Sequence, residues 1–132
     1  MADLLIVDDD PDMGELLGEA LVHHGHRVRI AHDGAAGLRE LAIRQPDAVL
    51  LDVEMPVLDG PGMAFQMFVR NCGLETIPVI LLSGVVDLDR VAARVGTPYF
   101  LGKPYTLGEV TALCNRALAE RTPPAPVCDD PI

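Results

Sequence analysis

Aromatic residues, basic residues and cysteines are all scarce in this sequence, and each shortage narrows the class of protein. Aromatic residues make up 4% of the 132 residues and tryptophan is absent, so we expect a core built from Leu, Val, Ile and Ala. The 10 Lys and Arg residues stand against 20 Asp and Glu residues, which gives a net charge of −10. Because an acidic surface repels the phosphates of nucleic acids and of anionic lipids, neither is expected as a direct partner.

The chain also lacks paired cysteines and long apolar runs. Its cysteines, Cys72, Cys114 and Cys128, are widely spaced and form no CxxC motif, which is typical of reduced cytoplasmic thiols. The longest nearly apolar stretch, residues 77–86, is far too short to cross a bilayer. Residues 1–12 lack the basic region that opens a signal peptide. We therefore expect a cytoplasmic protein that does not insert into membranes.

The length and composition are those of one domain. Hydrophobic residues make up 49% of the chain and charged residues 23%, close to the average of globular proteins. A chain of this size buries enough apolar surface to fold without a disulfide or a metal ion. Residues 122–132 are rich in proline and cannot extend a helix. We expect a domain over residues 1–121 and a tail over residues 122–132, either a frayed end or the start of a linker.

Short apolar runs alternate with longer amphipathic stretches along the chain. The runs at residues 4–7, 48–51 and 79–82 are continuously apolar, as in parallel strands that helices cover on both faces. Two more strands are expected at residues 27–31 and 99–101. This alternation predicts an α/β fold of (βα)5 type, with a doubly wound, five-stranded parallel sheet.

Five helices are expected between and after these strands. The first should begin at Pro11, with Asp10 as its N-cap, and stop near Gly25. The next three are expected at residues 35–44, 62–71 and 88–95, the last two of them ended by Gly73 and Gly96. The fifth should begin after Thr106, which has capping-box spacing with Glu109.

Acidic residues, a hydroxyl and a lysine stand at or just after the ends of four predicted strands. Asp8 and Asp9 follow the first, Asp52 the third, Ser83 the fourth and Lys103 the fifth. Because the carboxyl ends of parallel strands share one edge of the sheet, these side chains should converge there. Neighbouring carboxylates repel one another, and Mg²⁺, which prefers oxygen ligands, would relieve that repulsion. With a nearby ammonium group and hydroxyl, the arrangement predicts an aspartate that accepts a phosphoryl group.

Four motifs stand at these strand ends: LLIVDDD at residues 4–10, DVEMPVLDG at residues 52–60, LSG at residues 82–84 and LGKP at residues 101–104. In this order and at these spacings they resemble the receiver domain of bacterial two-component response regulators. The resemblance covers about residues 3–121. It implies the flavodoxin-like receiver fold.

The resemblance also implies a role for each residue at the predicted site. Asp52 would be the phosphoacceptor, supplied by the phosphohistidine of a sensor histidine kinase or a phosphotransfer protein. Asp9 and Asp52 would ligate Mg²⁺ directly, Asp8 mainly through water, and the backbone carbonyl of Glu54 would add a further ligand. Lys103 would pair with the acceptor and then with the phosphoryl oxygens.

Two further residues would form the switch of such a domain. Ser83 would supply the hydroxyl that moves to the phosphoryl group, and Phe100 the aromatic ring that turns inward as it moves; the Lys103–Pro104 bond would be cis. The family more often has Thr, Ala and Tyr where this chain has Ser83, Gly84 and Phe100. The protein would be no enzyme in the usual sense, assisting only its own phosphorylation and dephosphorylation. It would signal to an unknown downstream protein, as a monomer or weak homodimer.

Two alternatives stay open on the sequence. The Ser83–Gly84 pair also fits a degenerate receiver that acts as a phosphorylation-independent protein-binding module. A phosphatase of another α/β family with an aspartate nucleophile is the second alternative. It would need an acid two residues after the nucleophile, followed by Gly-Thr, whereas Glu54 is followed by Met.

Overall fold

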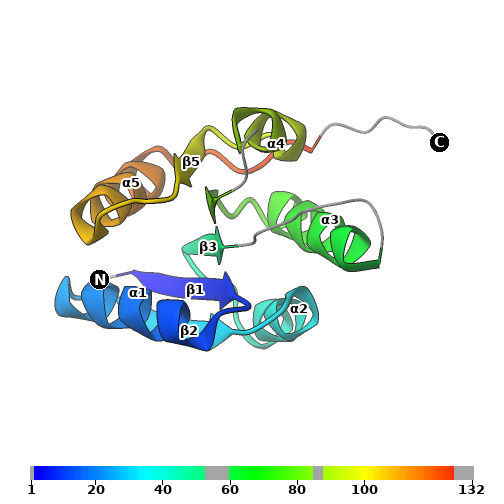
Figure 1. Cartoon of the computed structure of the whole chain (residues 1–132). Helices are drawn as coiled ribbons and strands as arrows, with labels where there is room; N and C mark the ends of the chain where they lie inside the picture. Colours follow the sequence, from blue (N-terminus) through cyan, green and yellow to red (C-terminus); the bar gives the residue numbers. More distant parts are fainter. Residues whose placement is uncertain (1, 53–59, 85–87, 127–132) are drawn as a thin grey trace.

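The computed structural model describes residues 2–52, 60–84 and 88–126 of the chain. In this part of the chain, strands and helices alternate throughout (Figure 1). The strands are β1 (Asp3–Asp8), β2 (Arg27–Ala31), β3 (Ala48–Asp52), β4 (Val79–Ser83) and β5 (Tyr99–Gly102). The helices are α1 (Pro11–His23), α2 (Gly34–Ile43), α3 (Gly60–Leu74), α4 (Leu88–Val95) and α5 (Leu107–Glu120). The predicted (βα)5 order is therefore confirmed.

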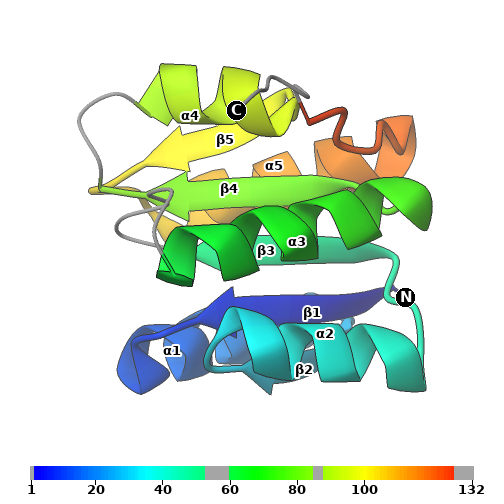
Figure 2. The same ribbon diagram turned by 90° about the vertical axis from the view of Figure 1, so that its right-hand side faces the viewer.

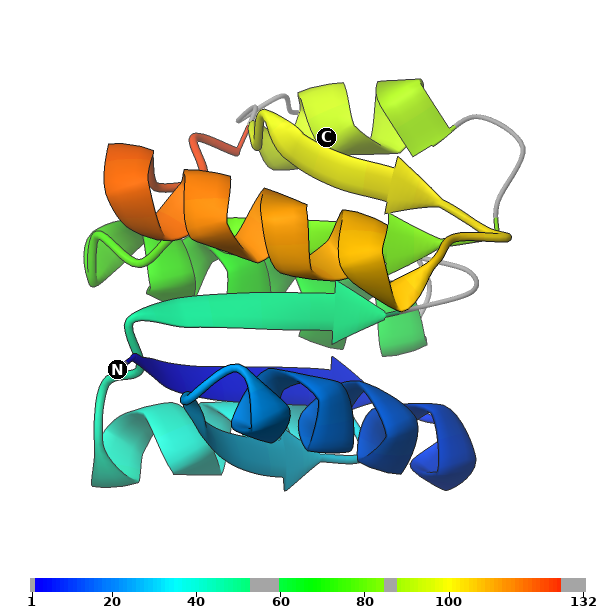
Figure 3. The same cartoon turned by 90° about the vertical axis from the view of Figure 1, so that its left-hand side faces the viewer.

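The strands form one parallel sheet in the order β2-β1-β3-β4-β5. The chain moves from β1 outward to β2, then crosses back to β3 on the other side of β1, so the order reverses at β1 and β3. Helices α2, α3 and α4 lie over one face of the sheet (Figure 2), and α1 and α5 lie over the other (Figure 3). This is the predicted doubly wound, flavodoxin-like arrangement, and it places the switch point between β1 and β3.

The apolar strands explain why helices cover both faces. Leu5 and Val7 of β1 belong to the core layer beneath α2, α3 and α4, which also contains Phe68. Leu4 and Ile6 of the same strand belong to the layer beneath α1 and α5. Because successive side chains of a strand point to opposite faces, a continuous apolar run must be buried on both. This packing fixes where each strand ends, and with it the residues that follow.

Most of the predicted helix ends are confirmed. The Asp10 carboxylate caps α1 by accepting from the backbone N–H of Asp12 at 3.0 Å. Thr106 and Glu109 form the predicted capping box: the Thr106 hydroxyl accepts from the Glu109 N–H at 3.1 Å, and the Glu109 carboxylate accepts from the Thr106 N–H at 2.8 Å. Gly96 follows α4 with a φ of +77°, a conformation that glycine adopts readily.

The prediction that Gly73 ends the third helix is wrong. Helix α3 continues through Gly73 to Leu74, and the chain leaves it at Thr76, which has a φ of 59°. Glycine is required at position 73 for a different reason. A Cβ atom there would lie 2.9 Å from the backbone oxygen of Pro124, a residue far along the chain. The glycine permits a close approach of the tail, which local sequence signals do not reveal.

The described part of the tail, residues 122–126, packs back on the domain. Pro124 is buried, and the backbone N–H of Ala125 donates to the Gly96 carbonyl at 3.0 Å. The tail starts beside Tyr99, whose hydroxyl accepts from the Thr122 N–H at 3.4 Å. The first residues of the tail therefore lie against the ends of α3 and α4, while the boundary at residue 121 stays a prediction.

The structure describes the surroundings of two of the cysteines and tests the helices as membrane spans. Cys72 and Cys114 are buried free thiols, and burial raises the pKa of each to about 12, which makes them unreactive. Cys128 lies outside the described residues. Within the described ranges, no helix is long and apolar enough to cross a membrane.

We expect Gly96→Ala to destabilise the protein, because its left-handed φ disfavours a side chain and a Cβ atom would lie 2.0 Å from the oxygen of Ala125. The loss in the free energy of unfolding, measured by urea titration, should be at least about 1–2 kcal/mol. The matched control is Gly108→Ala in the first turn of α5, where the nearest atom is 3.8 Å away. That change should stabilise the helix by up to about 1 kcal/mol. Equal stability of the Gly96→Ala variant and the wild type would contradict the described path of the tail.

Candidate functional site

Two buried carboxylates lie side by side at the switch point of the sheet. Asp8 ends β1 and Asp52 ends β3, and the parallel register pairs these two residues directly. Each is only 1% exposed. The apolar residues that precede them fix both strands, so the two carboxylates cannot move apart without disrupting the core. Such a pair is unfavourable unless other groups compensate its charge.

Asp52 receives compensation from the segment that follows β5. The Lys103 ammonium lies 3.1 Å from Asp52 Oδ1. The Tyr105 hydroxyl donates a hydrogen bond to Asp52 Oδ2 at 3.1 Å. Between them the Lys103–Pro104 peptide bond is cis, as the resemblance implied. The predicted convergence of Asp52 and Lys103 is therefore present.

Asp8 is compensated less completely than Asp52. Its Oδ1 accepts a hydrogen bond from the Asp10 N–H at 2.8 Å, but its buried Oδ2 has no hydrogen-bond partner among the described residues. Burial raises the pKa of Asp8 from 3.8 to about 6; the charge of Asp52 adds to this rise, while the Asp10 N–H and the Lys103 ammonium oppose it. A cation beside Asp8 would therefore stabilise the charged form of its carboxylate.

The donor set present fits a magnesium ion, and two of the four predicted ligands form it. Asp8 and Asp52 lie together, whereas Asp9 is exposed, and the Glu54 carbonyl lies outside the described residues. Across the described ranges, no group of three or more His, Cys, Asp or Glu side chains could hold a metal ion. Mg²⁺ needs no such cage, because it commonly binds through one or two carboxylates and keeps several waters. The unpartnered Asp8 oxygen is a suitable ligand for it.

The two predicted switch residues lie near the same edge of the sheet but differ in burial. Ser83 ends β4, is 1% exposed, and its carbonyl accepts from the Lys103 N–H at 3.0 Å. Phe100 lies on the edge strand β5, opposite Leu81 in register, and is 40% exposed. Ser83 is therefore hydrogen-bonded to the backbone of Lys103, while the Phe100 ring lies at the surface.

Tyr105 is the site residue that the sequence analysis missed. Its position two residues after Lys103 was the available signal, because a side chain on the same short segment can reach the same carboxylate.

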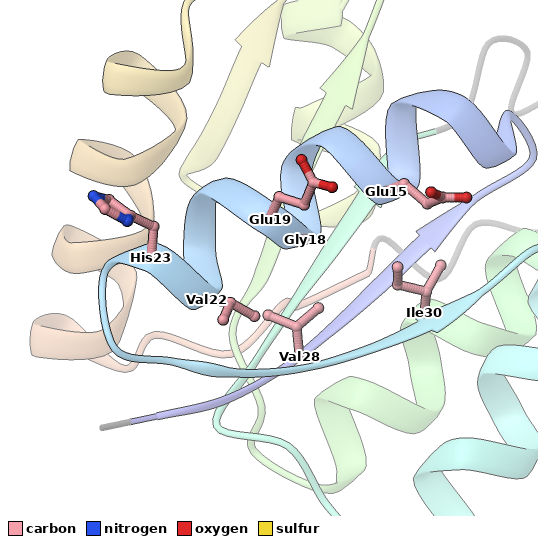
Figure 4. Close-up of a pocket in the computed structure, with 7 residues that line it drawn as sticks. All are labelled: Glu15, Gly18, Glu19, Val22, His23, Val28 and Ile30. Carbon is pink, nitrogen blue, oxygen red and sulfur yellow. The ribbon is translucent and has the colours of Figure 1, made fainter.

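A groove elsewhere, between α1 and β2, contains none of the predicted site residues (Figure 4). It is lined by Glu15, Gly18, Glu19, Val22, His23, Val28 and Ile30.

Known proteins share both the sequence pattern and this arrangement of strands. The family model of the response regulator receiver domain matches residues 4–115. The chain is 39% identical over 126 residues to the response regulator MprA of Mycobacterium avium (strain 104), a match that covers 92% of this chain and 52% of that protein. The chain thus spans about half the length of the curated relatives it matches.

Solved structures agree with this match. NtrX from Brucella abortus superposes with a TM-score of 0.77 at 28% identity, over 91% of this chain and 27% of that one. A response regulator receiver domain protein from Clostridium thermocellum superposes with a TM-score of 0.75 at 27% identity, over 92% of this chain and 97% of that one. Because sequence, sheet order and the family match agree over nearly the whole described domain, the chain belongs to the response regulator receiver domain family.

Proposed function

We propose that this domain accepts a phosphoryl group on Asp52, in the presence of Mg²⁺, and thereby switches a protein-interaction surface. The observation that carries the proposal is the Asp8–Asp52 pair, buried at the switch point, with Lys103 paired to Asp52 and Asp8 Oδ2 without a hydrogen-bond partner among the described residues. The donor would be the phosphohistidine of a sensor histidine kinase or a phosphotransfer protein, and the receiver of the signal a downstream protein. We place this signalling in the cytoplasm.

The proposed reaction is a direct transfer between two side chains. An oxygen of the Asp52 carboxylate attacks phosphorus, and the new O–P bond forms as the P–N bond of the phosphohistidine breaks. The imidazole leaves with the electron pair of that bond. Lys103, 3.1 Å from the carboxylate before the transfer, would then pair with the phosphoryl oxygens.

Asp8 and Asp52 would hold the magnesium ion, with Asp9 and the Glu54 carbonyl as further proposed ligands. When bound, Mg²⁺ would offset the charge of the carboxylates and of the incoming phosphoryl oxygens. Asp8 suits this role because, within the part of the chain that the structure describes, no donor reaches its buried Oδ2. It therefore stays available for an ion without first breaking a hydrogen bond.

The proposed switch begins at Ser83 and ends at the edge of the sheet. A phosphoryl group adds charge and acceptor oxygens beside Asp52, and only an arrangement that brings the Ser83 hydroxyl to them satisfies both. Movement of the chain at Ser83 would make room for the exposed Phe100 ring to turn inward. Phosphorylation would thus shift the population between two surfaces formed by α4, β5 and α5.

The direct test is phosphorylation by a small phosphodonor. Incubation with acetyl phosphate and Mg²⁺ should add one phosphoryl group to the wild type, measured by intact mass, and none to Asp52→Asn, which lacks the nucleophile. The control Asp89→Asn removes an exposed carboxylate on α4 and should be labelled like the wild type. If the wild type gains nothing, a phosphorylation-independent binding module replaces the proposal; if Asp52→Asn is still labelled, the acceptor is misassigned.

The raised pKa of Asp8 makes stability depend on pH. The folded protein holds a proton on Asp8 up to about pH 6, whereas the unfolded chain releases it near 3.8, so stability falls as the pH rises through this window. Without metal, Asp8→Asn should therefore raise the free energy of unfolding at pH 7.5 by up to about 3 kcal/mol. This gain should mostly vanish near pH 4, where folded Asp8 is protonated.

Urea titrations in EDTA at the two pH values measure this effect. Glu19→Gln, an exposed change on α1, is the control and should show no such pH-dependent gain. Excess Mg²⁺ should stabilise the wild type at pH 7.5 much more than Asp8→Asn. Equal stabilisation of both proteins by Mg²⁺ would argue against Asp8 as part of the metal site.

A further inference from the structure

The Tyr105 hydroxyl contacts the proposed acceptor itself. It donates to Asp52 Oδ2 at 3.1 Å, while the Lys103 ammonium lies 3.1 Å from Asp52 Oδ1. Each oxygen of the carboxylate therefore has a donor from the same short segment after β5. The lysine has an assigned role in the proposed transfer, but nothing in that transfer accounts for the tyrosine.

The segment that presents these two donors is fixed at both ends. At its start, the Lys103 N–H donates to the Ser83 carbonyl at 3.0 Å. At its end, the Thr106 N–H donates to the Glu109 carboxylate at 2.8 Å, within the capping box of α5. The Tyr105 side chain also packs against the core layer beneath α1 and α5. The phenol is thus held at Asp52 by its surroundings rather than by the one hydrogen bond alone.

A donor fixed on this carboxylate favours the free acceptor over the phosphorylated one. The free carboxylate shares a full negative charge between its two oxygens, and hydrogen bonds to charged groups are the strong ones. In an acyl phosphate one oxygen bonds to phosphorus and the other becomes a carbonyl, so the negative charge lies on the phosphoryl oxygens instead. Tyr105 therefore stabilises the starting state more than the product.

We propose that the Tyr105 hydroxyl restrains the acceptor. It slows phosphorylation of Asp52 and promotes loss of the phosphoryl group once it is attached. This inference rests on the proposed function and deepens it. With acetyl phosphate, Asp52 attacks phosphorus and acetate leaves with the electrons of the broken O–P bond. The phosphoryl group is lost by a different reaction, hydrolysis: water attacks phosphorus, and the O–P bond to Asp52 breaks with its electron pair on the leaving carboxylate. The protons of the water stay on the inorganic phosphate or pass to solvent. The Tyr105 hydroxyl opposes the first step and assists the second, because it stabilises the carboxylate in both.

Tyr105→Phe tests the restraint by removing one oxygen atom. At an acetyl phosphate concentration that phosphorylates the wild type in part, with Mg²⁺, this variant should show a ratio of phosphorylated to free protein roughly five- to tenfold higher. The chain offers a matched control, because its other tyrosine, Tyr99, lies at the start of β5 and donates to Glu120 at 2.9 Å. Tyr99→Phe should leave the ratio at its wild-type value.

The outcomes separate the inference from the function on which it rests. A wild type that gains no phosphoryl group overturns both. A wild type that is phosphorylated, with a Tyr105→Phe ratio equal to or below its own, overturns the restraint and leaves the proposed function standing. The same increase in Tyr99→Phe would also overturn it, since the effect would then not depend on contact with Asp52.

A second measurement observes Tyr105 directly, and its first comparison needs neither metal nor phosphodonor. Protein labelled with 3-fluorotyrosine should give two ¹⁹F resonances, one from each tyrosine, and Tyr99→Phe identifies that of Tyr105. Asp52→Asn removes the charge that the Tyr105 hydroxyl contacts, so it should shift the Tyr105 resonance and leave that of Tyr99 nearly in place. Phosphorylation of the wild type should shift the same resonance. A Tyr105 resonance that ignores both changes would refute the restraint even if Tyr105→Phe failed to fold.

Discussion

The repulsion between two carboxylates that the fold holds together governs the rest of this site. Parallel register pairs Asp8 with Asp52, and the apolar runs before them are buried on both faces of the sheet. Relief by moving one strand would expose core side chains, at a cost on the order of 1–3 kcal/mol for each large one. The charge must therefore be compensated by groups brought from elsewhere, and the next segments of the chain at this edge supply them.

That compensation is uneven, and the unevenness distinguishes the two aspartates. Lys103 and Tyr105 both approach Asp52, while Asp8 receives one backbone N–H and leaves Oδ2 without a partner among the described residues. Natural proteins rarely leave a buried carboxylate oxygen in this state, and the exceptions concentrate at functional sites. A domain whose own donors satisfied every buried carboxylate oxygen would be more stable without metal, but it would bind a cation more weakly.

The sequence predicted the features set by local patterns, and the convergence of strand ends that the (βα)5 topology implies, but it missed long-range contacts that have no local signal. Continuous apolar runs located the strands, and the Thr106–Glu109 spacing located the start of α5, because each signal acts within a few residues. Gly73 was misinterpreted because its partner, Pro124, lies in the tail. Tyr105 was missed because its contact with Asp52 exists only after β3 and β5 join the same sheet. Convergence of Asp9 with the buried pair stays a prediction.

The position of residues 103–105, directly after β5, explains why phosphorylation at the end of the central strand β3 should alter the structure at the edge strand β5. The Lys103 N–H donates to the Ser83 carbonyl, which ties the end of β4 to the residues after β5. β5 pairs with β4 on one side only, and it carries the exposed Phe100. An edge strand can shift with fewer broken contacts than a central one. On the proposed function, charge added at Asp52 would therefore be accommodated by β5 and its neighbours rather than by β1 or β3, which the core holds on both faces.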